Sequence, residues 1–234
     1  MPRPQRDEVL PRLILFDIDN TLLYTGGAGG LAMNLAFQEM FGINDGFAKV
    51  EFSGRTDLYI LSEGLRLHGI SGGLQAHLEE FLRRYYLHLE RTLAECKGHL
   101  MPGFPQLLEG LAQHDGIRIG LATGNFRQAA WMKVDHYGIK QYFAGGVFGE
   151  ASLDRSEMVR SGIETMAAGI APEGVLIIGD TPHDVSSALD NGLTAVGVAT
   201  GGYSADQLRE SGAQMVFPDF SGWQAAAAKL SGEA

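Results

Sequence analysis

The sequence is short of cysteine and of basic residues. Among 234 residues there is a single cysteine, Cys96, so an internal disulfide framework is excluded and a reducing compartment such as the cytoplasm is expected. Lysine and arginine together number 18 against 28 acidic residues, and the net charge of -10 argues against binding nucleic acid or anionic membranes. No apolar run approaches the length of a membrane span. With 45% hydrophobic residues, the chain can still bury a large core.

Two acidic residues follow the first apolar run of the chain. Residues 13–16 are typical of a buried strand, and Asp17 and Asp19 come directly after them. Because residues i and i+2 of a strand point the same way, the two carboxylates can converge on one small volume. In phosphoryl transfer, one Asp attacks phosphorus while a neighbouring acid protonates the leaving oxygen and later activates water. An Asx-type turn after the strand is the alternative interpretation.

Two further buried strands are predicted to end in polar residues. These residues are Thr123, Gly124 and Asn125 after residues 117–122, and Asp180 and Asp184 after residues 175–179. Ligands of open α/β sheets bind outside the carboxyl ends of the strands, so all three clusters would meet in one crevice. Carboxylates that share a site with a substrate phosphate are ligands that Mg²⁺ prefers. The sequence therefore predicts a magnesium and phosphate site.

The three clusters resemble, in order and content, three of the four signature motifs of the haloacid dehalogenase superfamily, in particular its phosphoglycolate-phosphatase-like members. By this resemblance, Asp17 is the nucleophile and Asp19 the acid and base. Magnesium would be held by Asp17, the backbone carbonyl of Asp19, and Asp180. Thr21 and Asp184 would lie behind these magnesium ligands and orient them. The phosphoryl oxygens would be bound by Thr123, Gly124 and Asn125.

The fourth motif of the family is normally a lysine, and here the sequence departs from the pattern. The matching position, about one helix before Asp180, is Arg155. An arginine keeps the positive charge and adds a planar fork suited to phosphate, although its reach differs from that of lysine. Arg160 lies one or two turns further along the same predicted helix and is the competing candidate.

The long region between the first two motif strands is predicted to be helical. Apolar residues at steps of three and four predict an amphipathic helix over 74–93, with shorter helices over 31–41 and 56–67. This insertion resembles the helical cap of the phosphatase subgroup, which closes over the crevice. The alternative is a helical subdomain that only adds stability. Within it, Arg55 is a candidate substrate contact, or else part of a helix start in which Thr56 or Asp57 stabilises the first turn.

The predicted organisation is a flexible tail (1–11), a Rossmann-like core (12–24 and 102–234) and a cap (25–101). The glycine-rich residues 26–30 are interpreted as a hinge loop into the cap, with the opposite hinge near residues 101–103. In the core, helices are expected over 126–137, 156–168, 184–190 and 204–210, and strands over 147–148, 194–198 and 215–217. This order predicts an α/β fold with a doubly wound parallel sheet. The large apolar residues between 126 and 137, such as Trp131 and Met132, are interpreted as helix packing, and neither they nor the loop histidine His183 are given a functional role.

The sequence thus predicts a Mg²⁺-dependent phosphatase for a small phosphorylated metabolite, with phosphoglycolate as the first candidate. A phosphomutase of the same superfamily would use the same motifs and stays open. A phospho-accepting regulatory domain without turnover is a third reading, which the acid at position 19 and the large insertion disfavour. A dehalogenase would normally lack that second acid. No oligomeric state is predicted.

Overall fold

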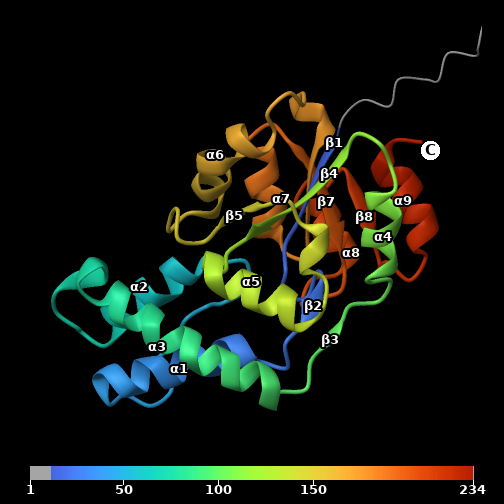
Figure 1. Cartoon of the computed structure of the whole chain (residues 1–234). Coiled ribbons are helices and arrows are strands. Elements are labelled where there is room, and N and C mark those ends of the chain that lie inside the picture. The colour runs from blue at the N-terminus through green and yellow to red at the C-terminus, as the bar shows by residue number, and fades with distance from the viewer. Residues whose placement is uncertain (1–11, 234) are drawn as a thin grey trace, which may run out of the picture.

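Six of the strands in the described residues form one parallel sheet, and β1 lies in its middle. In the computed structural model, which describes residues 12–233, the strand order is β5-β4-β1-β6-β7-β8 (Figure 1). The strands are β1 (Arg12–Phe16), β4 (Ile117–Thr123), β5 (Gly146–Phe148), β6 (Val175–Gly179), β7 (Thr194–Val198) and β8 (Met215–Phe217). The predicted doubly wound α/β sheet is confirmed. The predicted tail over residues 1–11 lies outside the described residues.

Helices cover both faces of the sheet because alternate strand residues are apolar on both sides. On one face, Ile14 and Phe16 of β1 pack with α4 (Gln106–Ala112), α5 (Arg127–His136) and α9 (Trp223–Ser231). On the other face, Leu13 and Leu15 pack with α6 (Arg155–Met166), α7 (Pro182–Leu189) and α8 (Ala205–Glu210). These four residues of β1 are fully buried. The central strand is therefore fixed from both sides, and so is the loop that follows it.

Three helices form a separate apolar cluster beside the sheet. They are α1 (Ala28–Phe41), α2 (Asp57–Leu67) and α3 (Gly73–Glu95), which lie together at the lower left of Figure 1. Their shared core is rich in aromatic side chains, including Phe37, Phe47, Phe81 and Tyr85. The amphipathic helix expected over 74–93 is confirmed as α3. We call these helices and their loops the helical part.

The connections to the helical part run side by side. Entry is through β2 (Leu23–Tyr24) and exit through β3 (His99–Leu100), which pair antiparallel. Gly26 and Gly27 follow with φ of 68° and 85°, values that favour glycine. A Cβ at Gly26 would lie 2.6 Å from the carbonyl oxygen of Lys97, so the two connections are in direct contact.

The glycine-rich hinge loop expected over 26–30 is shorter than predicted. Helix α1 already begins at Ala28, so Gly29 and Gly30 lie in its first turn. The first-turn amides need no partner inside the helix, and glycines are tolerated there more easily than in a helix interior. The conformationally special residues of this connection are therefore Gly26 and Gly27.

Several elements were not predicted from the sequence. These are α4, α9, the short strands β2 and β3, and the 3-10 helices η1 (Lys140–Tyr142) and η2 (Pro172–Gly174). Helices α4 and α9 pack against each other over one face of the sheet. The bounds of the predicted helices differ from the observed ones by at most three residues. Within residues 12–233, none of the helices combines the length and apolar character that crossing a bilayer requires.

Candidate active site

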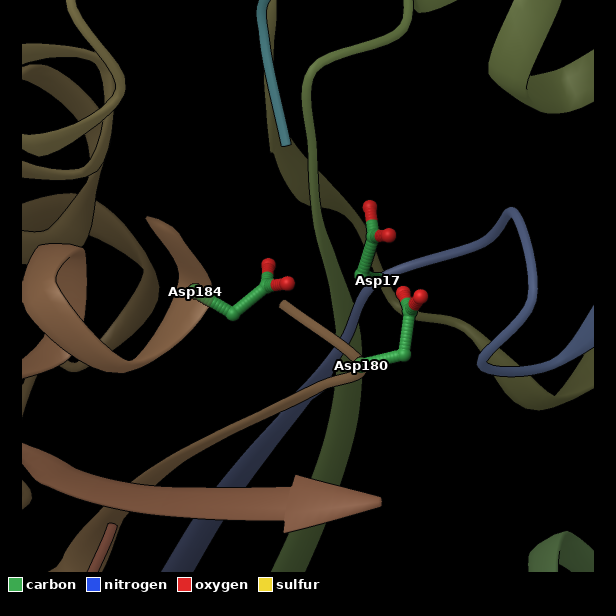
Figure 2. Close-up of side chains that lie close together, drawn as sticks. All are labelled: Asp17, Asp180 and Asp184. Atoms are coloured by element: carbon green, nitrogen blue, oxygen red, sulfur yellow. The ribbon is translucent and has the colours of Figure 1, made fainter. Parts of the chain in front are cut away.

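Three buried carboxylates meet at the carboxyl ends of the central strands. Asp17 follows β1, Asp180 follows β6, and Asp184 lies in the first turn of α7. Figure 2 shows their carboxylates gathered around one space, and one oxygen of each lies within 4.8 Å of the other two. Their exposed fractions are 7%, 2% and 1%. The acids predicted from the strand ends therefore lie together at one edge of the sheet.

The two carboxylate oxygens of Asp184 have different surroundings: Oδ2 belongs to a helix cap, and Oδ1 accepts no hydrogen bond from the described residues. Its Oδ2 accepts hydrogen bonds from the backbone N of Thr181 (3.0 Å) and from the hydroxyl of Thr181 (2.7 Å). The hydroxyl of Thr181 in turn caps the amide of Asp184, which completes a capping box at the start of α7. The other oxygen, Oδ1, is buried and has no hydrogen-bond partner among residues 12–233.

Arg155 is the cation of this cluster. It is the first residue of α6, and its side chain is buried. Its Nη2 lies 3.0 Å from Oδ1 of Asp17 and 2.6 Å from Oδ1 of Asp184, although the latter approach lacks hydrogen-bond geometry. Nη2 also donates to the carbonyl of Ala122 at 3.2 Å. Of the two candidates weighed from the sequence, the structure places Arg155 beside Asp17, while Arg160 is exposed further along α6.

The cluster carries more negative charge than Arg155 can offset. Burial, together with the charges of Asp184 and Asp19, raises the pKa of Asp17 to about 6 although Arg155 lowers it. Burial and the charges of Asp184 and Asp17 raise the pKa of Asp180 to about 8. Thr21 donates to Asp180 Oδ1 at 3.3 Å. A bound divalent cation would remove this excess charge.

The donor set fits magnesium. Carboxylate oxygens are the hard ligands that Mg²⁺ binds, and Oδ1 of Asp184, which accepts no hydrogen bond within residues 12–233 but lies 2.6 Å from Arg155 Nη2, belongs to the same cluster. The space for these carboxylates depends on glycine, because a Cβ at Gly201 would overlap the carboxylate of Asp180. The residues present are therefore consistent with the predicted metal site.

Asp19 has a different cation, Lys133, which the sequence analysis missed. The Lys133 ammonium lies 2.8 Å and 2.6 Å from the two carboxylate oxygens of Asp19 and 2.6 Å from Oδ1 of Asn125. Asn125 also donates from Nδ2 to Asp19 Oδ2 and to the hydroxyl of Thr123, both at 2.8 Å. The Asn125 side chain, predicted to bind phosphate, thus makes its hydrogen bonds to Asp19, Thr123 and Lys133 in this structure.

A signal for Lys133 is visible in the sequence once the helix is drawn. Ala129, Ala130 and Val134 form the buried face of α5, and Lys133 lies on that same face with 3% exposure. A lysine is almost never fully buried without a partner. The prediction for residues 126–137 concerned only the large apolar residues, which do pack against the core, and it left Lys133 unassigned.

One segment of the helical part is anchored on the loop after β4. The backbone N of Asp57 donates to the carbonyl of Gly124 at 2.7 Å, and the carboxylate of Asp57 accepts from the backbone N of Phe126 at 2.9 Å. Thr56 is the N-cap of α2, with its hydroxyl accepting from Tyr59 N. The guanidinium of Arg55 forms an ion pair with Glu51 at 2.8 Å. Arg55 also borders the cavity described below. Burial raises the pKa of Asp57 to about 7.

A cavity of about 390 Å³ lies between the helical part and the carboxyl edge of the sheet. Its floor includes Asp17, Asp19 and Asp180, and its walls include Lys133 and Arg155. This volume lies within the range of small-molecule sites. The fold and the cavity together define an α/β protein with an acidic site of a size that suits a small ligand.

Comparison with known proteins identifies the family. A model of the haloacid dehalogenase-like hydrolases matches residues 11–192, and the chain belongs to this family. It is similar to a phosphoglycolate phosphatase of Rhodospirillum rubrum, with 26% identity over 91% of this chain and 89% of the relative. A 5'-nucleotidase of Pseudomonas aeruginosa is 28% identical over 84% of this chain and 86% of its own.

Solved structures confirm the fold. A β-phosphoglucomutase of Clostridium difficile matches with a TM-score of 0.70 and 16% identity, over 96% of this chain and 98% of that chain. At this identity, the match is evidence for the fold alone. The predicted superfamily, its phosphoglycolate-phosphatase-like subgroup and the enzyme class are confirmed by the family model and the relatives.

Proposed function

We propose that the protein is a Mg²⁺-dependent phosphatase that hydrolyses a small phosphate monoester. The observation that carries the proposal is the set of three buried carboxylates with Arg155 against Asp17, two of which, Asp17 and Asp180, line a cavity at the sheet edge. Two acids with pKa values raised by burial and mutual repulsion are typical of a functional site. The named activities of the relatives support the same reaction class.

Bound magnesium would be held by Asp17, Asp180 and the backbone carbonyl of Asp19, with Asp184 oriented toward the same cluster. It would supply charge neutralisation for the phosphate, which otherwise faces these acids. Arg155, the hydroxyl of Thr123 and the amides after it would bind the phosphoryl oxygens. Fixed donors of this kind stabilise the charge of the transition state.

The reaction uses two neighbouring carboxylates in turn. Asp17 attacks phosphorus, the bond from phosphorus to the leaving oxygen breaks, and Asp19 gives its proton to that oxygen. A water molecule then attacks the phosphorus of the aspartyl-phosphate and gives a proton to Asp19, and the bond to Asp17 breaks to release phosphate. Lys133 and Asn125 fix the orientation of the Asp19 carboxylate throughout.

Steady-state turnover tests the proposal. With Mg²⁺, the protein is expected to hydrolyse p-nitrophenyl phosphate over many turnovers, and a panel of phosphorylated metabolites that includes phosphoglycolate ranks the natural candidates. Release of one phosphate at most per protein chain would contradict a phosphatase and favour a phospho-accepting regulatory domain. Transfer of the phosphoryl group to a sugar hydroxyl would instead favour the mutase alternative, which stays a prediction.

A further inference from the structure

One wall of the cavity has no part in the reaction described above. It consists of the first turn of α1 and of Tyr85 on α3, and both belong to the helical part. Gly29 connects them, because a Cβ there would lie 3.9 Å from the Tyr85 hydroxyl and 3.2 Å from Nζ of Lys133. Since Lys133 holds Asp19, and Asp19 exchanges its proton with the leaving oxygen, this wall lies on the leaving-group side.

The Tyr85 hydroxyl makes no hydrogen bond to any side chain or backbone group within residues 12–233. The residue as a whole is 1% exposed and lines the cavity, so the accessible part of its side chain faces the cavity. Its ring is fixed by stacking on Phe81 and by an edge contact with Phe126. Burial raises the pKa of Tyr85 well above its ordinary value, so the hydroxyl keeps its proton. Buried hydroxyls normally have partners, and this one borders the cavity.

The first turn of α1 presents further donors to the same space. The helix has 14 residues, and no side chain caps its N-terminus, where Gly27 is the N-cap. First-turn amides have no acceptor inside a helix and carry its partial positive charge. Gly27, Gly29 and Gly30 all border the cavity, and without side chains they leave the backbone open to a ligand.

We propose that Tyr85 and the first turn of α1 form a specificity subsite for an oxygen acceptor, a hydroxyl or a carboxylate, at the far end of the leaving group. The inference rests on the proposed function, because it places the leaving oxygen at Asp19. A leaving group without such an oxygen leaves the Tyr85 hydroxyl unpaired, and sites built to hydrogen-bond a substrate discriminate strongly against analogues that lack the bonding group. The cavity of about 390 Å³ suits a short leaving group.

Three phosphates of similar length test the subsite: ethyl phosphate, 2-hydroxyethyl phosphate and phosphoglycolate, which carries the carboxylate. Tyr85→Phe removes the donor and keeps the ring. We expect kcat/KM of this variant to fall about threefold to tenfold for the hydroxyl compound, or about tenfold to a hundredfold for the carboxylate, since bonds to charged groups are stronger. Ethyl phosphate should stay within about twofold. The size of the loss therefore tells which acceptor the subsite binds.

Tyr86→Phe is the matched control. Tyr86 is the next residue of α3, but it borders a different groove with Leu82 and Met132 and is not among the residues that line the cavity. It should leave all three substrates unchanged. An equal loss on all three substrates in Tyr85→Phe would show a purely structural role and overturn the subsite, and so would no loss on any of them.

The proposed function and the subsite fail separately. If the wild-type protein turns over neither these phosphates nor p-nitrophenyl phosphate, the phosphatase proposal fails and the subsite with it. If it turns over p-nitrophenyl phosphate while Tyr85→Phe keeps the wild-type ratios of kcat/KM among the three phosphates, the subsite alone is refuted.

Discussion

Arg155→Ala removes the buried cation from between two carboxylates. Breaking a buried pair by removing one partner typically costs about 3–5 kcal/mol. For a chain of this length, one kcal/mol corresponds to about 2–4 °C in Tm, so the expected loss is roughly 6–20 °C. Turnover should fall on the order of a hundredfold or more, because a fixed donor beside the phosphoryl site is lost with it.

Thermal unfolding with Mg²⁺ and with a chelator is the decisive assay for Arg155→Ala. A divalent cation offsets the same carboxylate charge, so Mg²⁺ should raise the Tm of the variant more than that of the wild type. Arg155→Lys keeps the positive charge but replaces the planar guanidinium fork by a single ammonium nitrogen. Its Tm and turnover should therefore lie between those of the wild type and of Arg155→Ala. Arg160→Ala changes an exposed arginine on the same helix and is expected to shift Tm by only about 1–2 °C.

Two outcomes would refute this reasoning. If Arg155→Ala unfolds at the wild-type temperature in chelator, the short distances to Asp17 and Asp184 do not stabilise the fold. If Arg160→Ala loses turnover while Arg155→Ala keeps it, the cation of the phosphoryl site is assigned to the wrong turn of α6.

Three further predictions concern individual carboxylates. Asp17→Asn should abolish turnover with an unchanged circular dichroism spectrum, because the amide is nearly isosteric but cannot attack phosphorus; more than trace activity would contradict this role. Calorimetric titration should find weaker Mg²⁺ binding at pH 5.5 than at pH 8.5, because protons compete for Asp17 and Asp180, whose pKa values are about 6 and about 8; equal affinities would argue against the site. The folded pKa of Asp57, about 7, lies above its ordinary 3.8, so its ionisation destabilises the native state as pH rises toward and past 7. Urea unfolding should show that Asp57→Asn removes on the order of 1 kcal/mol of the loss in unfolding free energy between pH 6 and pH 8.5, and an identical pH dependence in both proteins would contradict it.

The sequence was sufficient where position follows from strand direction. Asp17, Thr123 and Asp180 each end a buried strand, and parallel strands bring their carboxyl ends to one edge, so their meeting needed no knowledge of side-chain packing. The prediction of Arg155 required the family motif in addition, because the start of a helix does not by itself show which of its side chains points into the protein.

The sequence was insufficient where a contact depends on packing between distant segments. Lys133 meets Asp19 across 114 positions, and Asp57 meets Phe126 across 69. Neither pairing follows from a periodic pattern, since each depends on how the helical part and α5 lie over the sheet edge. Helices α4 and α9 were missed for a related reason: they are short, lie outside the motifs and are stabilised largely by each other and by the sheet.

The contact between the two connecting segments has a mechanical consequence. Leu23 and Tyr24 pair with Leu100 and His99, and Gly26 touches Lys97, so the chain crosses to the helical part through one joined ribbon. Two independent hinges would let the three helices twist as well as tilt. A single joined ribbon restrains rotation of the helical part about the ribbon's long axis. The motion that it restrains least is rotation of the three helices together about one hinge axis. Spectroscopic labels on α1, α2 and α3 should then report one common opening rate.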